Sequence, residues 1–262
     1  MLFRLALVLL GPLLFLQGRY VRRVTPRLPE AAGQREGSAG DGSPLSVLIL
    51  GDSAAAGVGV ADQGQALSGQ LTEALAHKHT VHWRLLARSG DRLDQLLDSL
   101  PHPSPDIAPV DWVVVSIGVN DVTALRRSQA WMADLQALIS VLRERFGQPK
   151  ILFSSLPPMG RFPALPQPLR WWMGQRAAEF DRKMQTILAR QPDCHYLRIP
   201  YGADQSAIAS DGFHPGAAAY RVWAAAAAER MMAVSDSQER SAKRVPVDQS
   251  SEVSGLLMEN AR

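Results

Sequence analysis

The sequence predicts an α/β protein, a three-layer α/β/α sandwich built on a five-stranded parallel sheet. Short apolar runs of strand length alternate along the chain with longer segments of helix length, as in right-handed βαβ units. The apolar runs are almost continuous, which is typical of parallel strands whose two faces are both covered by helices. The composition, 46% hydrophobic and 20% charged, is that of an ordinary globular protein with one sizeable core.

Each element is predicted from its own stretch of sequence. The first strand is an apolar run that ends at Gly51, and the third is the most strand-like stretch in the chain. The predicted strands are residues 45–50, 81–87, 111–117, 150–156 and 194–199. The predicted helices are residues 63–79, 92–100, 130–146, 173–190 and 217–232. This order of elements predicts a fold of flavodoxin-like type.

Three further segments lie outside the predicted α/β domain, which we place at residues 45–233. Residues 25–44 are rich in Gly, Pro, Ala and Glu without apolar periodicity, and are predicted to be a linker. Residues 234–262 are polar and irregular, and are predicted to be a flexible tail. Residues 1–24 form an apolar N-terminal segment, either a membrane anchor or a signal-like sequence.

The N-terminal segment favours membrane association. The fourteen residues between Arg4 and Arg19 are nearly all apolar and would form about 21 Å of helix, against a bilayer core of about 30 Å. The apolar run is not followed directly by a small-residue cleavage site, and arginines follow it, so we expect a retained anchor. The side of the membrane stays open. The alternatives are export after signal cleavage and a core helix packed on the domain.

Charge and cysteine content exclude several classes of function. Residues 1–40 carry a net charge of +4 and the rest of the chain −1, so the domain has no basic face for nucleic acid. Cys194 is the single cysteine, which rules out an intrachain disulfide, and its apolar setting predicts a buried thiol. Five of the six histidines show no metal-ligand spacing, so no metal is expected: His77, His79, His82, His102 and His195.

Polar residues follow the predicted strands at the points where those strands end. Because ligands bind at the carboxyl edge of a parallel sheet, we expect these residues to meet there. The four polar blocks are Gly51-Asp52-Ser53, Ser89-Gly90-Asp91, Gly118-Val119-Asn120-Asp121 and Asp211-Gly212-Phe213-His214-Pro215.

These residue types are the ones that acyl transfer requires. The Ser53 hydroxyl needs a base such as His214 to take its proton, and the imidazole needs an acceptor such as Asp211. The backbone N–H groups of Ser53 and Gly90 and the side-chain amide of Asn120 are candidate donors to an oxyanion. As an alternative, Ser53 could serve only as the N-cap of a helix.

The four blocks resemble those of the SGNH hydrolase superfamily, in particular its GDSL-like serine esterases and lipases. The resemblance covers roughly residues 45–232 and implies Ser53, Asp211 and His214 as catalytic triad, with Ser53, Gly90 and Asn120 as oxyanion hole. Ala54 stands where the family name has leucine. The elbow motif G-x-S-x-G of other hydrolases is absent because Ala55 occupies its last position.

The sequence therefore predicts a carboxylic ester hydrolase that acts on short-acyl or lipid esters through an acyl-enzyme, without cofactor or metal. The alternatives are a carbohydrate O-acetyl esterase and a non-catalytic ligand-binding α/β module. A phosphate-binding domain is disfavoured because no lysine accompanies the glycines after Ser53. Apolar residues of one loop could form an acyl-binding wall or pack in the core: Met159, Phe162, Leu165, Trp171 and Trp172. The oligomeric state stays open.

Overall fold

A computed structural model describes the chain over residues 2–101, 108–200 and 207–244; side chains in the two terminal helices are described for residues 10–24, 217–237 and 240. The chain forms two compact units, Met1–Ala228 and Glu229–Arg262, which are described separately. The first unit contains the sheet and the predicted site. Of the second unit, the described part is the end of the last helix.

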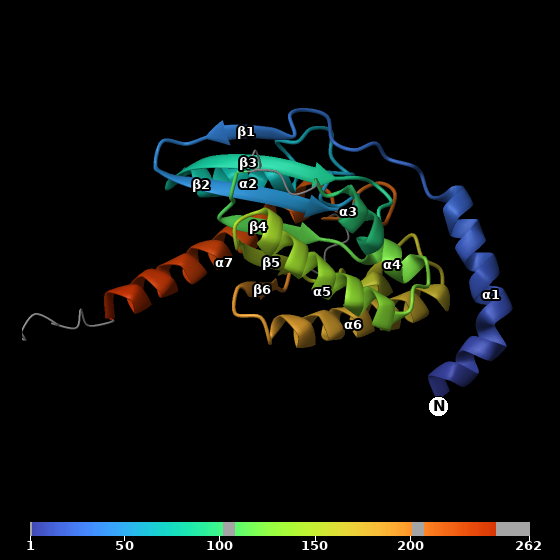
Figure 1. The fold of residues 1–262 in the computed structure, drawn as a ribbon. Coiled ribbons are helices and arrows are strands. Elements are labelled where there is room, and N and C mark those ends of the chain that lie inside the picture. The colour runs from blue at the N-terminus through green and yellow to red at the C-terminus, as the bar shows by residue number, and fades with distance from the viewer. Residues whose placement is uncertain (1, 102–107, 201–206, 245–262) are drawn as a thin grey trace, which may run out of the picture. The chain divides into compact units, whose positions relative to one another are not determined.

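The centre of the first unit is a six-stranded sheet with the order β1-β3-β2-β4-β5-β6 (Figure 1). Five neighbouring strands are parallel, as predicted, and β1 alone pairs antiparallel with β3. The strands are β1 Glu36–Ala39, β2 Ser43–Gly51, β3 His79–Ala87, β4 Trp112–Ser116, β5 Lys150–Ser154 and β6 Cys194–Leu197.

Helices cover both faces of the sheet, which confirms the predicted three layers. α3, α5 and α6 lie over one face, and α2 with the start of α7 lies over the other (Figure 1). The helices are α1 Leu2–Val24, α2 Leu67–Ala76, α3 Leu93–Ser99, α4 Val119–Thr123, α5 Ser128–Arg145, α6 Leu169–Leu188 and α7 Ala217–Arg244. A short 3₁₀ turn, η1, spans Met159–Arg161.

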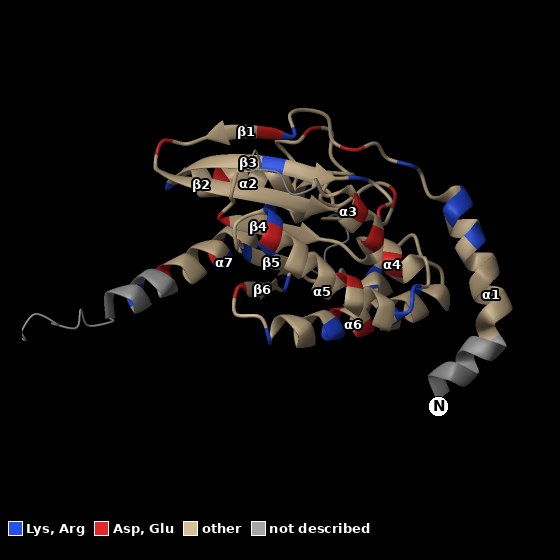
Figure 2. Cartoon of the chain, viewed as in Figure 1, with Lys and Arg blue, Asp and Glu red and all other residues tan. Residues whose placement is uncertain are grey.

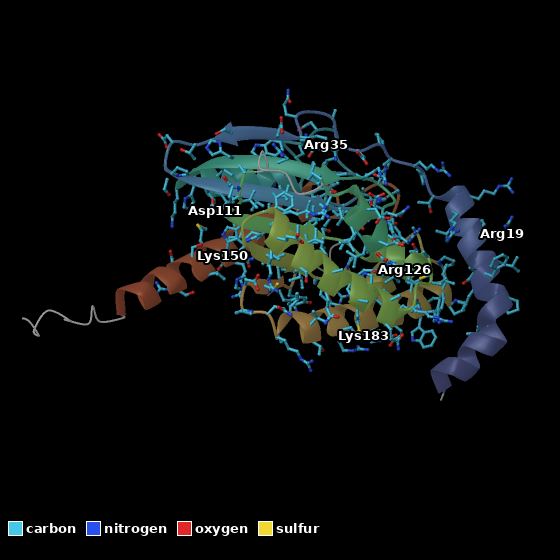
Figure 3. All side chains as sticks on the ribbon, in the orientation of Figure 1. Arg19, Arg35, Asp111, Arg126, Lys150 and Lys183 are labelled. Carbon is cyan, nitrogen blue, oxygen red and sulfur yellow. The ribbon has the colours of Figure 1, made fainter. Side chains whose placement is uncertain are left out.

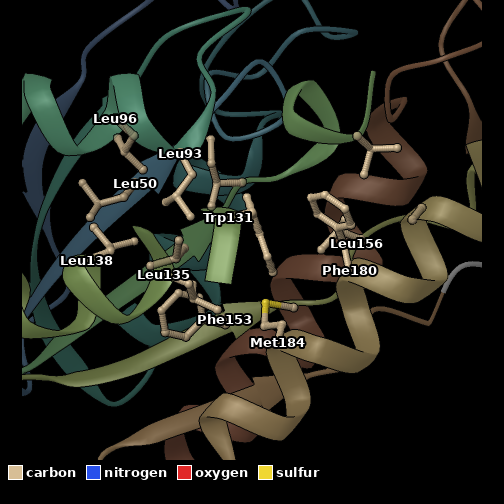
Figure 4. Close-up of a cluster of buried hydrophobic side chains, with 14 of the residues drawn as sticks. Leu50, Leu93, Leu96, Trp131, Leu135, Leu138, Phe153, Leu156, Phe180 and Met184 are labelled. Carbon is tan, nitrogen blue, oxygen red and sulfur yellow. The ribbon is translucent and has the colours of Figure 1, made fainter. Parts of the chain in front are cut away.

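A large hydrophobic core lies between the sheet and the helices α3, α5 and α6 (Figure 4). Its side chains alternate along the strands and recur every three or four residues along the helices, so each element turns one face inward. Trp131 of α5 packs on Phe180 of α6 with ring centroids 5.0 Å apart. Full burial of one such apolar side chain contributes roughly 1.5–3 kcal/mol. Figure 4 labels Leu50, Leu93, Leu96, Trp131, Leu135, Leu138, Phe153, Leu156, Phe180 and Met184.

Two predicted segments differ from the structure. The predicted linker 25–44 contains the edge strand β1 and the first residues of β2, so the sheet has six strands rather than five. Its sequence carries no strand signal because three of the four β1 residues are exposed and the strand exists only by pairing with β3. The last helix was predicted to end at residue 232 but continues to Arg244, so residues 234–244 of the predicted tail are helical. The rest of that tail, 245–262, lies outside the described residues.

The N-terminal helix α1 packs on the start of α6. Leu14 and Val21 are buried, and Gln17 donates to the carbonyl oxygen of Gln167 at 2.6 Å and accepts from the N–H of Leu169 at 3.1 Å. The predicted anchor also covers residues 2–9, whose side chains lie outside the description. Within the described part of the chain, none of the helices is both long enough and apolar enough to cross a membrane.

Basic residues are interspersed with acidic ones over the α/β unit (Figure 2). The end of α1 differs, because its arginines have no acidic residue beside them in the sequence. Positive charge is therefore concentrated at the end of α1 and not on a face of the sheet.

Candidate active site

Ser53 stands in the loop that leaves the end of β2. Gly51 closes this strand at a point where the backbone of β4 comes close: a Cβ at residue 51 would lie 2.1 Å from the carbonyl oxygen of Ser116. Only glycine fits such an approach. The turn that follows is held by Asp52, whose Oδ1 accepts from the N–H of Ala54 at 3.1 Å. These contacts fix the backbone on both sides of the Ser53 hydroxyl.

His214 and Asp211 reach Ser53 from the loop that enters α7. The distance from His214 Nε2 to Ser53 Oγ is 2.9 Å, and that from His214 Nδ1 to Asp211 Oδ2 is 2.5 Å. Asp211 Oδ1 also accepts from the backbone N–H groups of Phe213 and His214, both at 3.0 Å. The three side chains predicted as a triad therefore form one continuous chain of hydrogen bonds.

Asp211 is buried, and its environment favours the ionised form. Burial alone would raise the pKa of Asp211, but the hydrogen bonds from His214 and from two backbone N–H groups outweigh it and lower the pKa. A carboxylate at this position can fix the imidazole tautomer with its proton on Nδ1, which leaves Nε2 free to accept the proton of Ser53.

The two other predicted oxyanion donors lie on neighbouring segments. Asn120 belongs to α4, and its Nδ2 donates to the carbonyl oxygen of Asp91 at 2.9 Å, which ties it to the loop that carries Gly90. An amide nitrogen has two N–H groups, so one is left for a ligand. Gly90 has a φ of 89°, a left-handed conformation that favours glycine, and no atom lies within 4 Å of where its Cβ would stand. The roles of Gly90 and Asn120 stay predictions.

Asp121 adds a second hydrogen bond between α4 and the chain that follows Gly90. Its Oδ2 accepts from the N–H of Leu93 at 3.1 Å, and its Oδ1 accepts from Arg126 at 3.0 Å. Arg126, which is labelled in Figure 3, also pairs with Asp94 and Asp134, so this guanidinium joins α3, α4 and α5. Burial raises the pKa of Asp121. The short helix α4, which the sequence did not predict, is thus held in place through its polar side chains.

A cavity of about 320 Å³ opens beside Ser53 and His214. Its wall is mainly apolar and comes from the ends of β4, β5 and β6, from the loop before α6 and from the first turns of α7. Among the residues that line it are Ile117, Leu156, Pro157, Phe162, Ile199, Ala219, Val222 and Trp223. Arg161 and Asp52 are charged residues in the lining, and burial raises the pKa of Asp52 to about 7. The cavity is therefore suited to an apolar group next to the serine.

The apolar residues in the loop before α6 and at the start of that helix were predicted either to line an acyl-binding cavity or to pack in the core, and the structure shows both. Phe162 lines the cavity, whereas Met159, Leu165 and Trp172 are buried in the core and Trp171 is partly exposed. The contribution of α7 to the cavity was not predicted, since the first turns of this helix are mostly alanine. Tyr220 of α7 was not predicted either; its hydroxyl lies within hydrogen-bond distance of the carbonyl oxygens of Ala54 (2.9 Å) and Val58 (2.8 Å) and can donate its one proton to either, which supports the Ser53 loop.

The other candidate reactive groups lie apart from this site. Cys194 is buried on β6, and burial raises the pKa of its thiol to about 12, so it is inert near neutral pH. Within the described part of the chain, His, Cys, Asp and Glu side chains nowhere gather in a group of three or more that could hold a metal ion.

The chain is similar to a known protein family and to several solved structures. The profile of the GDSL-like Lipase/Acylhydrolase family matches residues 49–222. No curated protein matches the chain. Among solved structures, a carbohydrate esterase family 2 enzyme of Corynascus thermopiles (Myceliophthora fergusii) superposes with a TM-score of 0.59 at 17% identity, covering 76% of this chain and 68% of that one.

Two smaller enzymes share the fold over nearly their whole length. The lipase Lip_vut3 from a goat rumen metagenome has a TM-score of 0.57 at 18% identity, covering 72% of this chain and 96% of that one. The psychrotrophic esterase EstA from Pseudoalteromonas sp., solved with monoethylphosphonate as inhibitor, has a TM-score of 0.55 at 15% identity, covering 73% and 98%. At these identities the likeness concerns the fold. The family profile spans most of the chain, which therefore belongs to the GDSL-like lipase/acylhydrolase family of the SGNH hydrolases.

Proposed function

We propose that this protein hydrolyses carboxylic esters through an acyl-enzyme formed on Ser53. The observation that carries the proposal is the chain of hydrogen bonds from Ser53 through His214 to the buried Asp211. Membership of a family of lipases and acylhydrolases supports it. The esterase of the same fold that is inhibited by monoethylphosphonate also supports it, because a phosphonate resembles the tetrahedral intermediate of ester hydrolysis.

The reaction follows from the positions of these groups. Ser53 Oγ attacks the ester carbonyl carbon while His214 Nε2 takes its proton, and the carbonyl oxygen becomes an oxyanion. The N–H groups of Ser53, Gly90 and Asn120 donate to that oxyanion. When the intermediate collapses, the leaving alcohol takes the proton from His214. A water molecule then attacks the acyl group by the same steps, and the acid is released as Ser53 regains its proton.

We propose further that the acyl group occupies the apolar cavity, so that short-acyl or lipid esters are the substrates. Each methylene transferred from water into such a cavity contributes about 0.8 kcal/mol. A carbohydrate O-acetyl ester is the alternative, supported by the fold shared with a carbohydrate esterase. An acetyl group would leave most of the apolar wall uncovered, whereas a longer chain would cover it.

A series of p-nitrophenyl esters from acetate to decanoate tests this proposal. We expect kcat/KM to rise with chain length and Ser53→Ala to abolish turnover. Ala219 lines the cavity, so Ala219→Trp should lower the rate for the longer esters more than for acetate. Ala225→Trp, on the exposed side of the same helix, is the matched control. A preference for acetate that Ala219→Trp leaves unchanged would favour the carbohydrate esterase. Turnover by no ester would favour a binding module.

The proposal includes association with a membrane through α1. Four exposed apolar residues of this helix recur every three or four positions and so share one side: Leu13, Leu16, Tyr20 and Val24. Three exposed arginines lie near them: Arg19, Arg22 and Arg23 (Arg19 is labelled in Figure 3). An apolar side with basic residues beside it is typical of helices that lie on anionic lipid.

Sedimentation of the full chain with phosphatidylglycerol or phosphatidylcholine vesicles measures this association. Binding should be stronger to the anionic vesicles, and Leu16→Glu should weaken it. Ala137→Glu, at an exposed position of α5, is the control for added charge. Equal binding of all three proteins, or no binding to either vesicle, would contradict the association.

A further inference from the structure

The segment 30–35 lies before the first strand and outside the region matched by the family profile, yet it contacts two loops of the candidate site, the one after Ser53 and the one that carries Gly90. It was predicted to be a linker. In the structure its two ends, Glu30 and Arg35, contact the loop before Gly90, and Ala31 and Ala32 between them contact the loop after Ser53. Its contacts to each loop are hydrogen bonds with defined partners.

The first contacts fix the segment to the loop after Ser53. The N–H of Ala31 donates to the carbonyl oxygen of Ala56 at 3.3 Å, and the N–H of Ala32 donates to that of Ala61 at 3.0 Å. Gln63 joins the two segments, because its Nε2 donates to the carbonyl oxygens of both Ala31 and Ala56 at 3.1 Å. Gln63 is itself buried. Residues Ala31 and Ala32 of the segment are therefore bound to the backbone of the Ser53 loop.

The second set of contacts fixes the loop before Gly90. Glu30 Oε1 accepts from the N–H of Ser89 at 2.6 Å, and Glu30 Oε2 pairs with Arg35 at 2.9 Å. Arg35 (Figure 3) in turn donates to the carbonyl oxygen of Ala87. Burial would raise the pKa of Glu30, but the Ser89 N–H and Arg35 outweigh it and lower the pKa. Glu30 is thus ionised at neutral pH. Together Glu30 and Arg35 hold the loop on either side of Arg88.

Gly90 lies between two residues that are hydrogen-bonded to other segments: Ser89, bound by Glu30, and Asp91, bound by Asn120. On its far side the carbonyl oxygen of Asp91 accepts from Asn120. Gly90 itself has no side chain and a left-handed φ, so nothing within the residue limits its backbone. The turn around Gly90 is also closed by a hydrogen bond from the Asp91 N–H to the carbonyl oxygen of Arg88 at 3.2 Å and by the Arg88–Asp91 ion pair at 2.8 Å. The orientation of the Gly90 N–H therefore depends on these local contacts together with the attachments at Ser89 and Asp91. The attachment at Ser89 comes from Glu30 and Arg35, far from the site in the sequence.

We propose that Glu30 and Arg35 are positioning residues, which hold the Gly90 N–H in the orientation that stabilises the oxyanion. This inference rests on the proposed ester hydrolysis. Their effect belongs to the transition state, because the oxyanion does not exist in the bound ester. A displacement of about 1 Å at such a site can cost about 100-fold in rate. Loss of the pair should therefore lower kcat while the KM for the ester changes little.

The test compares Glu30→Ala with a matched ion pair that touches no loop of the site. Glu36 and Arg84 form such a pair at 3.3 Å on the exposed edge of the sheet. We expect Glu30→Ala to lower kcat about 10- to 100-fold, with KM within about threefold. Glu36→Ala should stay within about twofold of wild type. Glu30→Gln, which keeps an acceptor for the Ser89 N–H, should lie between the two. Arg35→Met, which keeps Glu30 as acceptor for the Ser89 N–H but removes the contact to Ala87, should also lie between the two.

Affinity for a trifluoromethyl ketone, which forms a tetrahedral adduct with an activated serine, separates positioning from folding. Glu30→Gln and Glu30→Ala should lose affinity for it by the factor by which kcat falls. A kcat equal to wild type would overturn the inference. So would a fall in melting temperature with unchanged inhibitor affinity, which would mean that the pair only stabilises the fold. If wild type itself neither turns over esters nor reacts at Ser53, the proposed function fails and this inference with it.

Discussion

Replacement of Asp211 by Asn tests the hydrogen-bond chain with little change of shape. The substitution keeps the side-chain volume, and the Asn oxygen can still accept from the N–H groups of Phe213 and His214. The other terminal atom becomes an NH₂ group that faces His214 Nδ1 across the present distance of 2.5 Å. Two donors cannot face each other, so Nδ1 must become the acceptor and the ring proton must move to Nε2.

A proton on Nε2 then faces Ser53, and His214 can no longer accept the serine proton. In serine hydrolases with this arrangement the same change lowers kcat about 10⁴-fold, which corresponds to about 5.5 kcal/mol of transition-state free energy. We expect a loss of this order for p-nitrophenyl butyrate at pH 7.5, with KM changed by less than about threefold. The control is Asp193→Asn, which weakens the ion pair with Arg143 away from the site. An Asp211→Asn enzyme that keeps a tenth of the wild-type kcat would refute the role given to Asp211.

Two further predictions concern the oxyanion hole and the buried carboxyl beside it. Asn120→Ala should lower kcat about 10²- to 10³-fold with little change in KM; an effect on KM alone would mean that Asn120 binds the substrate. Asp52 has a pKa raised to about 7 in the fold, so it stabilises the fold below pH 4 and this stabilisation is lost as the pH rises towards 7. Asp52→Asn should therefore gain stability relative to wild type between pH 5 and pH 8 in urea unfolding; a constant difference would contradict the raised pKa.

The elements that could be predicted are those whose own sequence has a distinctive pattern of apolar residues. The strands β2 and β4 are apolar because both of their faces are buried, and such runs are distinctive even in a single sequence. The polar blocks then follow from topology, since the carboxyl ends of parallel strands share one edge of the sheet. Ser53 and His214 were therefore predicted to lie close together although they are 161 positions apart in the sequence, and in the structure they are hydrogen-bonded.

The unpredicted features depend on contacts between distant residues. β1 is four residues long and mostly exposed, and its strand conformation comes from pairing with β3. α4 is a five-residue helix held by Asn120 and Asp121, and it is too short for apolar periodicity to identify it. Glu30 and Arg35 stand in a segment of linker-like composition, where nothing in the local sequence distinguishes them from other charged residues. Only the folded backbone places them beside Ala87 and Ser89.

The most direct test of the account is labelling of the full chain with a fluorophosphonate probe, followed by mass spectrometry to locate the adduct. A hydroxyl that is not activated reacts poorly with such a probe, so the site of labelling identifies the nucleophile. We predict one adduct, on Ser53, which disappears in Ser53→Ala and forms much more slowly in His214→Ala. An adduct on another serine, or none from the folded protein at pH 8, would contradict the assignment of Ser53 as an activated nucleophile.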